Sequence, residues 1–297
     1  MDNAGGRWRM TVAMALSGTI GVLVLASGQE PLTVVLFRCM LGAMALLGLL
    51  AWRGGWTRLD RRALAWIGLG AAAIIGNWLC LFSAFALCGI SVATVVYHTQ
   101  PFILVVLAAL VQGERPQRVK LWLMLPAFAG VALTTGIDSS AIEPALVAGV
   151  LLALAAAFLY AVATLATRKL AAYAPAQIAG LQLALGALLL APFGNIAFDQ
   201  VSVTAWGALL VIGLVHTGLV YNLMYGAFQR LSASTIASLS FIYPLVAVVA
   251  DLLVLDARLE PLQWLGMALI LASLAASQSR IFLRIRPSPS GSAGNSA

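Results

Sequence analysis

The clearest structural signal in this 297-residue chain lies in residues 91–116, SVATVVYHTQPFILVVLAALVQGERP. No Asp, Glu, Lys or Arg interrupts it before Glu114, and about 20 mostly apolar residues are enough for a helix to cross a bilayer. Similar runs recur along the chain, separated by short polar breaks. The sequence therefore predicts an all-α integral membrane protein with ten transmembrane helices, at residues 10–28, 31–51, 63–86, 91–111, 119–136, 145–166, 175–195, 203–228, 233–255 and 261–279.

The composition excludes a water-soluble domain. Hydrophobic residues make up 62% of the chain and charged residues only 9%, whereas about a quarter of a soluble domain is charged. The three cysteines, Cys39, Cys80 and Cys88, lie in apolar runs without metal-ligand spacing, which gives no support to a disulfide framework or a zinc site. The net charge of +7 leaves nucleic acid open as a partner until the cations are placed.

Lys and Arg are concentrated on one side of the predicted membrane, as the positive-inside rule requires. With the N-terminus inside, the outer side receives only Arg258, and Arg38 lies within the second span. We therefore expect a multi-pass inner-membrane protein with both termini in the cytoplasm and no affinity for nucleic acid. The inner side receives Arg7, Arg9, Arg53, Arg58, Arg61, Arg62, Arg115, Arg118, Lys120, Arg168, Lys169, Arg230, Arg280, Arg284 and Arg286.

The two halves of the chain match each other at nearly constant spacing. They predict two five-helix units, residues 1–140 and 141–279, followed by a disordered cytoplasmic tail at 280–297. Because five is odd, the second unit enters the membrane the opposite way round, which is the inverted repeat common in secondary transporters. The matched pairs are Pro31 and Pro175, Arg38 and Gln182, and Gly42 and Gly186 at 144 positions, and Phe85 and Phe228, Ser91 and Ser234, and Pro101 and Pro244 at 143.

The run at 91–116, its echo at 232–261 (SASTIASLSFIYPLVAVVADLLVLDARLEP) and the ten-span plan resemble the drug/metabolite transporter superfamily, specifically its EamA-type exporters. The overall sequence is most similar to the YddG-type exporters of aromatic and other amino acids. This resemblance implies export of amino acids or similar small metabolites across a bacterial inner membrane without ATP hydrolysis by the protein. The second copy has Arg-Leu-Glu in place of Gly-Glu-Arg, which leaves the role of Glu260 open.

The fourth span carries the most informative polar residues. Thr94, Tyr97, His98 and Pro101 recur at helical spacing and share one face, and Pro101 is expected to bend the helix. Tyr97 and His98 are candidate substrate-binding residues, because ionisable groups within a membrane tend to be functional. The simpler alternative is that both side chains only bond to neighbouring helices.

Three other spans add candidates at similar depth. On the ninth span, Ser240 matches Tyr97, and Pro244 is expected to bend the helix as Pro101 does; Tyr243 beside it is a further candidate for substrate binding. The third span offers Asn77 and Trp78, and the eighth offers His216 and Tyr221. The rings of Trp78 and Tyr221 are suited to stacking or to cation–π contact with a substrate, unless they face lipid. His216 is equally suited to a structural role.

Arg38 lies inside the second span, where a guanidinium costs ~2.5 to 3.5 kcal/mol on insertion scales. We consider it a candidate for binding a substrate carboxylate. The alternative is an arginine that bonds helix carbonyls or snorkels outward, with Gln182 as its neutral counterpart.

The leading hypothesis is a secondary transporter that exports amino acids or similar metabolites by alternating access. Its expected partners are a small-molecule substrate and the lipid bilayer. Neither partner requires a second copy of the chain, so a monomer is compatible with this hypothesis. Alternatives are an exporter of cationic drugs or other metabolites, a channel-like pore and an intramembrane lipid enzyme. The sequence contains no GxxxxGK[ST] loop and no HExxH motif, so we expect no catalytic residue, no metal and no cofactor.

Overall fold

The computed structural model describes residues 3–135, 144–194, 202–254 and 261–278, and this part of the chain is helical, without a β-strand. Glu260 and the tail predicted at 280–297 lie outside the described residues. The helices are α1 (Ala4–Gly18), α2 (Ile20–Ser27), α3 (Pro31–Arg53), α4 (Arg61–Tyr97), α5 (Gln100–Gln112), α6 (Arg118–Thr135), α7 (Pro144–Lys169), α8 (Pro175–Leu190), the 3-10 helix η1 (Ala191–Phe193), α9 (Val203–Gly213), the π-helix η3 (Leu214–Leu219), α10 (Val220–Phe228), α11 (Ala233–Ser240), α12 (Ile242–Val254) and α13 (Pro261–Gln278).

Eight helical stretches of the described residues are long and apolar enough to cross a membrane. The other two predicted spans are not among these eight. The fifth corresponds to α6, which carries Arg118 and Lys120 near its start. The tenth corresponds to α13, in which the shorter apolar helix covers Pro261–Ser277. The eight stretches are Ala4–Ser27, Pro31–Arg53, Arg61–Cys88, Val92–Gln112, Pro144–Lys169, Pro175–Phe193, Val203–Phe228 and Ala233–Val254.

The ends of these helices follow from local sequence. Pro31 and Pro175 occupy the first turn of α3 and α8, where a missing N–H group breaks no hydrogen bond. Gly28, Gly54 and Gly113 end α2, α3 and α5 with φ values of 59°, 66° and 65°, a left-handed conformation that glycine adopts without steric cost.

Side-chain caps start α4 and α9 in the same way. The Ala63 backbone N–H donates to Asp60 Oδ1 (2.6 Å), and the Ala205 N–H donates to Ser202 Oγ (3.1 Å). Each contact satisfies a donor that the first turn of a helix leaves without a partner.

The backbone of α4 is helical over 37 residues, yet it contains parts of two spans. Asn77 Nδ2 lies 3.4 Å from Tyr97 Oη, whereas a straight helix would separate residues 20 positions apart by ~30 Å. The chain therefore turns back on itself within α4.

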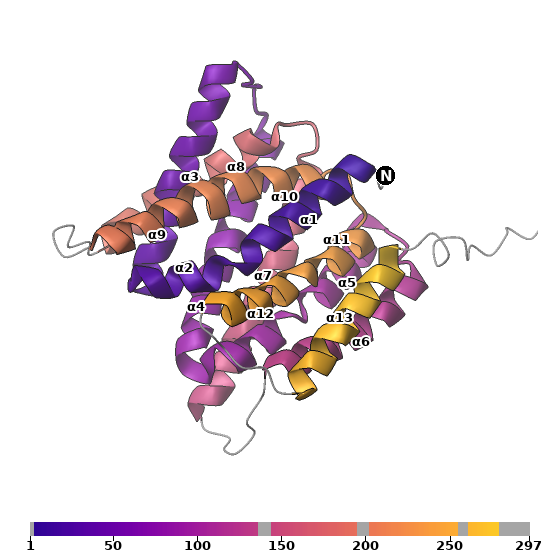
Figure 1. Ribbon diagram of the computed structural model, residues 1–297. Coiled ribbons are helices and arrows are strands. Elements are labelled where there is room, and N and C mark those ends of the chain that lie inside the picture. Colours follow the sequence, from indigo (N-terminus) through magenta and orange to yellow (C-terminus); the bar gives the residue numbers. More distant parts are fainter. Residues whose placement is uncertain (1–2, 136–143, 195–201, 255–260, 279–297) are drawn as a thin grey trace, which may run out of the picture.

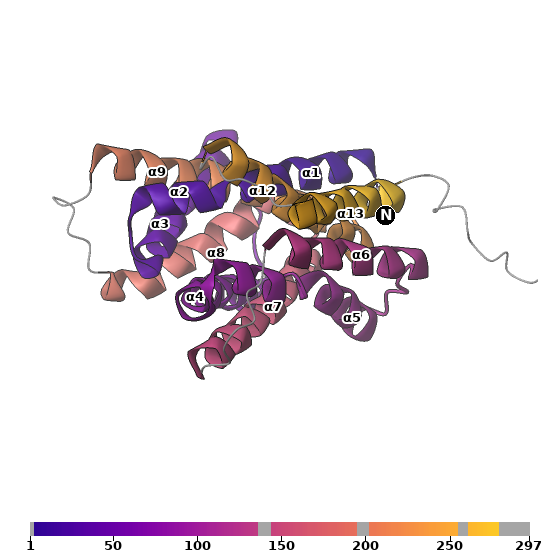
Figure 2. The same ribbon diagram turned by 60° about the horizontal axis from the view of Figure 1, so that its bottom comes forward.

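The helices pack in pairs that join distant parts of the chain (Figures 1 and 2). The α1–α2 segment lies beside α9 and α10, α3 packs on α8, α4 on α7, and α6 on α13. A Cβ atom added at Gly42 would lie 2.8 Å from Thr217 Cγ2, and one at Gly186 would lie 2.7 Å from Cys39 Sγ. Small residues thus allow close approach between helices, as in other membrane proteins.

The outer surface of this bundle is apolar. Leu110, Leu188 and Leu253 are exposed by 76%, 72% and 78%. Large apolar side chains are exposed on most of the helices, which suits a bundle surrounded by lipid.

Four spans are irregular near their middle. Thr19 separates α1 from α2, His98 and Thr99 separate α4 from α5, Phe241 separates α11 from α12, and η3 is a π-turn. The second and third breaks lie just before Pro101 and Pro244. Each proline lacks an N–H group and crowds the carbonyl four residues earlier, which interrupts the helix.

Candidate functional site

A cavity of about 530 Å³ lies among the four irregular spans, within the usual size range of small-molecule sites. Irregular backbone at membrane depth is tolerated where it is buried in protein or lines a cavity. Pro244 contributes to the wall, whereas Pro101 is buried outside it. All nine residues predicted to bind substrate line the cavity: Arg38, Asn77, Trp78, Tyr97, His98, His216, Tyr221, Ser240 and Tyr243.

Arg38 points into the protein from α3 and is only 5% exposed. Its Nε donates to Thr217 Oγ1 (3.1 Å), and its Cζ lies 4.0 Å from the centroid of the Trp78 ring, a cation–π contact. Among the described residues it forms no ion pair with a carboxylate. Because the side chain is buried and donates to a hydroxyl, neither outward snorkelling nor a bond to a helix carbonyl describes the arrangement of Arg38.

Trp78 and Tyr221 are in contact with each other in the wall of the cavity. Trp78 Nε1 donates to Tyr221 Oη (3.1 Å), and the two rings meet edge to face at 5.4 Å. Both residues are buried, so the lipid-facing alternative does not hold for either. The pair joins α4 to α10 and fixes the ring on which the guanidinium lies.

The π-turn η3 directs His216 and Thr217 inward. Thr217 Oγ1 donates to the Ile212 carbonyl, five residues earlier, at 2.9 Å. His216 Nε2 is hydrogen bonded to Thr19 Oγ1 (2.9 Å), and its Nδ1 lies 3.4 Å from the Val211 carbonyl oxygen. Both ring nitrogens have partners, which favours the structural interpretation of His216.

His98 has a different environment at the end of α4. Its Nδ1 donates to the Thr94 carbonyl (2.6 Å), which leaves Nε2 as the ring atom able to accept a proton. The imidazole centroid lies 5.7 Å from that of Tyr243 and 6.3 Å from that of Phe241. Ser240 lines the same region, and its hydroxyl donates to the Ile236 carbonyl (2.9 Å).

Asn77 connects Tyr97 with α7 at the cavity. Asn77 Nδ2 donates to the Ala156 carbonyl (2.7 Å) and also lies within reach of Tyr97 Oη. Tyr97 in turn meets the edge of Tyr160, whose hydroxyl donates to Met224 Sδ (3.4 Å). These contacts bring α4 and α7 together at the cavity.

Several residues of the wall were not predicted from the sequence. Tyr160 stands alone in an apolar run of α7, without the polar neighbours that drew attention to Tyr97. Its only sequence signal is a phenol at mid-span depth. Phe82, Phe85, Gln100 and Met224 also line the cavity.

The cavity extends toward one end of the bundle. Its wall continues through Val24, Leu25, Phe85 and Gln263, which lie near the span ends that the cation distribution places outside. At the other end the space between the helices is filled by side chains that are at most 2% exposed: Met10, Leu170, Tyr225, Phe228 and Leu231.

Polar contacts tie the helices together at this filled end. The Glu114 carboxylate forms an ion pair with Arg168 in the last turn of α7 and accepts from the Ala233 N–H at the start of α11 (3.0 Å). Lys120 Nζ of α6 donates to Thr235 Oγ1 of α11 (2.6 Å). We call the contacts of Glu114 with Arg168 and Ala233 the Glu114 clamp.

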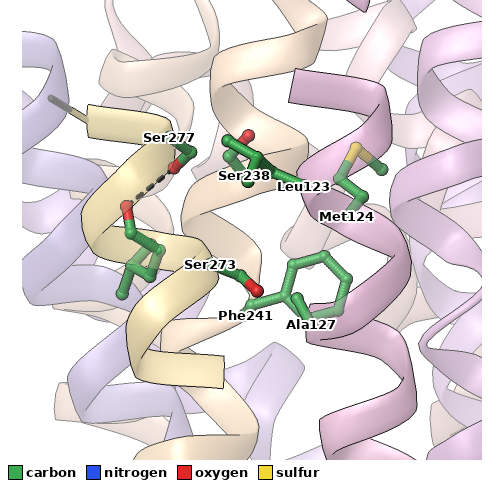
Figure 3. Close-up of a pocket in the computed structure, with 8 residues that line it drawn as sticks. Leu123, Met124, Ala127, Ser238, Phe241, Ser273 and Ser277 are labelled. Carbon is green, nitrogen blue, oxygen red and sulfur yellow. Dashed lines mark hydrogen bonds between the residues drawn. The ribbon is translucent and has the colours of Figure 1, made fainter. Parts of the chain in front are cut away.

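A second pocket is too small for a substrate. Ser238, Phe241, Ser273 and Ser277 gather with Met124 between α6, α11 and α13 (Figure 3). Its volume is about 10 Å³, which is room for about one water molecule. Within the described residues, no three His, Cys, Asp or Glu side chains are arranged to bind a metal.

Comparison with known sequences identifies the family. A sequence model of the EamA-like transporter family matches residues 9–136 and, separately, residues 147–277. The chain belongs to the EamA-like transporter family. These transporters form part of the drug/metabolite transporter superfamily, as the sequence resemblance implied.

Relatives of this EamA-like chain include the uncharacterized transporter YxxF of Bacillus subtilis, 28% identical over 280 residues that cover 92% of this chain and 89% of YxxF. The uncharacterized transporter sll0355 of Synechocystis is 26% identical over 89 residues, 30% of this chain and 27% of that protein. A solved structure, described only as the crystal structure of a protein, has a TM-score of 0.80 at 21% identity and covers 93% of this chain and 97% of its own.

These findings confirm the prediction of a membrane transporter of the EamA type. The family and the name of the Bacillus relative indicate a transporter rather than an enzyme. The eight apolar spans indicate that this EamA-like transporter is a multi-pass membrane protein.

Proposed function

We propose that this transporter exports amino acids, aromatic and other apolar or small ones, or similar small metabolites across the inner membrane by alternating access. The observation that carries the proposal is the cavity among four interrupted spans, lined by aromatic and polar side chains. Discontinuous helices around a site near the bilayer midplane are a recurring feature of secondary transporters.

Two inverted five-helix repeats are part of this proposal. The family model matches each half of the chain once. Helix packing also recurs in equivalent pairs: α4 packs on α7 as α10 packs on α1, while α3 packs on α8 and α6 on α13. We propose ten spans in all, with both termini in the cytoplasm.

The open and filled ends of the cavity correspond to an outward-facing state. In the inward-facing state the packed cytoplasmic end would separate and the outer end would close. Pro101 and Pro244, next to helix breaks in matched spans, would act as hinges for this exchange.

An aromatic wall favours a substrate with an apolar or aromatic body. Rings at Trp78, Tyr97, Tyr160, Tyr221 and Tyr243 surround the space, and aromatic pairs gain stability beyond area burial. This wall supports the proposed similarity to the YddG-type exporters.

Counter-flow in proteoliposomes tests the proposal. Vesicles loaded with unlabelled phenylalanine, tyrosine, leucine or alanine should accumulate the same labelled amino acid transiently and with saturation. Measurements at pH 6 and pH 8 show whether proton movement accompanies flux. Empty liposomes provide the control.

Three results would contradict the amino-acid proposal. Uptake of cationic drugs without amino-acid counter-flow would favour the drug-exporter alternative. Flux that rises linearly with concentration would indicate a pore, and turnover of a labelled lipid without flux would indicate an enzyme.

A further inference from the structure

Arg38 is held in a fixed orientation by two contacts that leave it charged and facing the cavity. Thr217 accepts from its Nε, and Trp78 covers one face of its guanidinium. The Trp78–Tyr221 and Thr217–Ile212 hydrogen bonds fix these neighbours in turn. A binding group that is already ordered loses little entropy when a ligand arrives.

These contacts do not neutralise the charge of Arg38. A hydroxyl and an aromatic ring stabilise a guanidinium only partly, and among the described residues no carboxylate pairs with it. A buried cation without a counter-ion is costly, so an intramembrane arginine of this kind indicates a functional site whose partner arrives from elsewhere.

The equivalent position in the second half lacks this chemistry. Gln182 is neutral and 1% exposed; its Oε1 accepts from Tyr225 Oη (2.5 Å), and its Nε2 is buried without a partner. It therefore offers a substrate neither charge nor access. Among the described residues that line the cavity, Arg38 is the only Arg or Lys.

We infer that Arg38 binds the carboxylate of the substrate and that a carboxylate is required for recognition, whereas an amino group is not, because no Asp or Glu is among the described residues that line the cavity. This inference rests on the proposed export function. The planar guanidinium matches a carboxylate with two parallel hydrogen bonds. The apolar body of the substrate then lies against Phe82, Phe85 and Tyr243, which line the same cavity.

The inference separates three compounds with the same aromatic body. Phenylalanine carries both charged groups, phenylpyruvate carries the carboxylate without the amine, and phenethylamine carries the amine without the carboxylate. Phenylalanine and phenylpyruvate should inhibit counter-flow of labelled phenylalanine with similar potency. Phenethylamine should be at least tenfold weaker; equal potency would overturn the inference.

Substitutions test the same point independently. Arg38→Gln introduces the residue found at position 182 and should weaken phenylalanine binding at least tenfold, while Arg38→Lys should lose less. Arg53→Gln, at the exposed end of the same helix, should bind as the unmodified protein does. Binding is measured with labelled phenylalanine in detergent, after size-exclusion chromatography has shown that each variant is folded.

The two proposals fail in different ways. If the unmodified protein shows no counter-flow of any amino acid, the proposed function fails. If it transports phenylalanine but Arg38→Gln binds it unchanged, only the assignment of Arg38 fails. The three-compound comparison uses the unmodified protein, so it remains decisive even if Arg38→Gln does not fold.

Discussion

At the scale of single residues, the cavity is organised around a chain of contacts rather than around isolated side chains. Tyr221 accepts from Trp78, Trp78 lies under Arg38, and Arg38 donates to Thr217. The hydroxyl of Tyr221 therefore affects the guanidinium through the indole ring. A change at one end of the chain should be detectable at the other.

Tyr221→Phe keeps the ring but removes the acceptor for Trp78 Nε1. We expect the affinity for labelled phenylalanine to fall about two- to tenfold, the size of one net hydrogen bond, with the protein still folded. Tyr173→Phe, in the turn between α7 and α8 and outside the cavity wall, provides the control. Equal affinity in the two variants would show that the hydrogen bond does not orient the site.

The sequence could identify many of the polar residues of the cavity but not their orientation. Spacing and depth were enough to select Tyr97, His98 and Trp78, because polar and aromatic groups at mid-span are rare. The direction of Arg38 depends on Thr217 and Trp78, which come from other helices. No pattern within the second span contains that information.

At the scale of helices, the ends were predictable and some of the breaks were not. Proline at the start of a helix and glycine just after its end act locally, so the predicted spans agree with the observed ones to within a few residues at most ends. Pro101 and Pro244 likewise marked two breaks. The π-turn at Leu214–Leu219 contains no proline, so the sequence carries no comparable mark of this break.

The Glu114 clamp joins α5, α7 and α11 at the filled end of the cavity. Glu114→Gln removes the ion pair with Arg168, which should favour the state in which this end opens. We expect Leu231→Cys, buried in the structure, to react several times faster with a membrane-impermeant thiol reagent in inside-out vesicles. Both substitutions are made in a protein in which alanine replaces the three native cysteines, so that position 231 carries its single thiol.

Glu30→Gln provides the matched control for the clamp. Glu30 is exposed beside the start of α3, at the opposite end of the bundle, and its substitution should leave the reaction rate of Leu231→Cys unchanged. Equal rates in all three proteins would mean that the clamp does not hold the cytoplasmic end closed.

At the scale of the whole molecule, charge and shape point in the same direction. In the part of the chain that the structure describes, the cations gather at the end where the helices are packed, and the cavity reaches toward the end that is poor in cations. On the proposed orientation, which follows the positive-inside rule, this is an outward-facing state. The sequence alone predicts the orientation but not which end is open, because that depends on the packing of both halves.

Single cysteines in the cysteine-free protein test the orientation. In intact cells, an impermeant maleimide should label Gln29→Cys, between α2 and α3, and should not label Trp56→Cys, between α3 and α4, until the membrane is permeabilised. Both positions lie outside the helices. The reverse pattern would place the termini outside and would make the observed state inward-facing.

The π-turn has an evolutionary consequence. The caps Asp60 and Ser202 are 142 positions apart, whereas Trp78 and Tyr221 are 143 apart. On the proposed repeat, the later copy therefore contains one more residue between cap and aromatic ring, and the wider π-turn accommodates it without displacing either. A single extra residue thus sets Thr217 against Arg38 in one half alone, which suits the recognition of a substrate that has no symmetry.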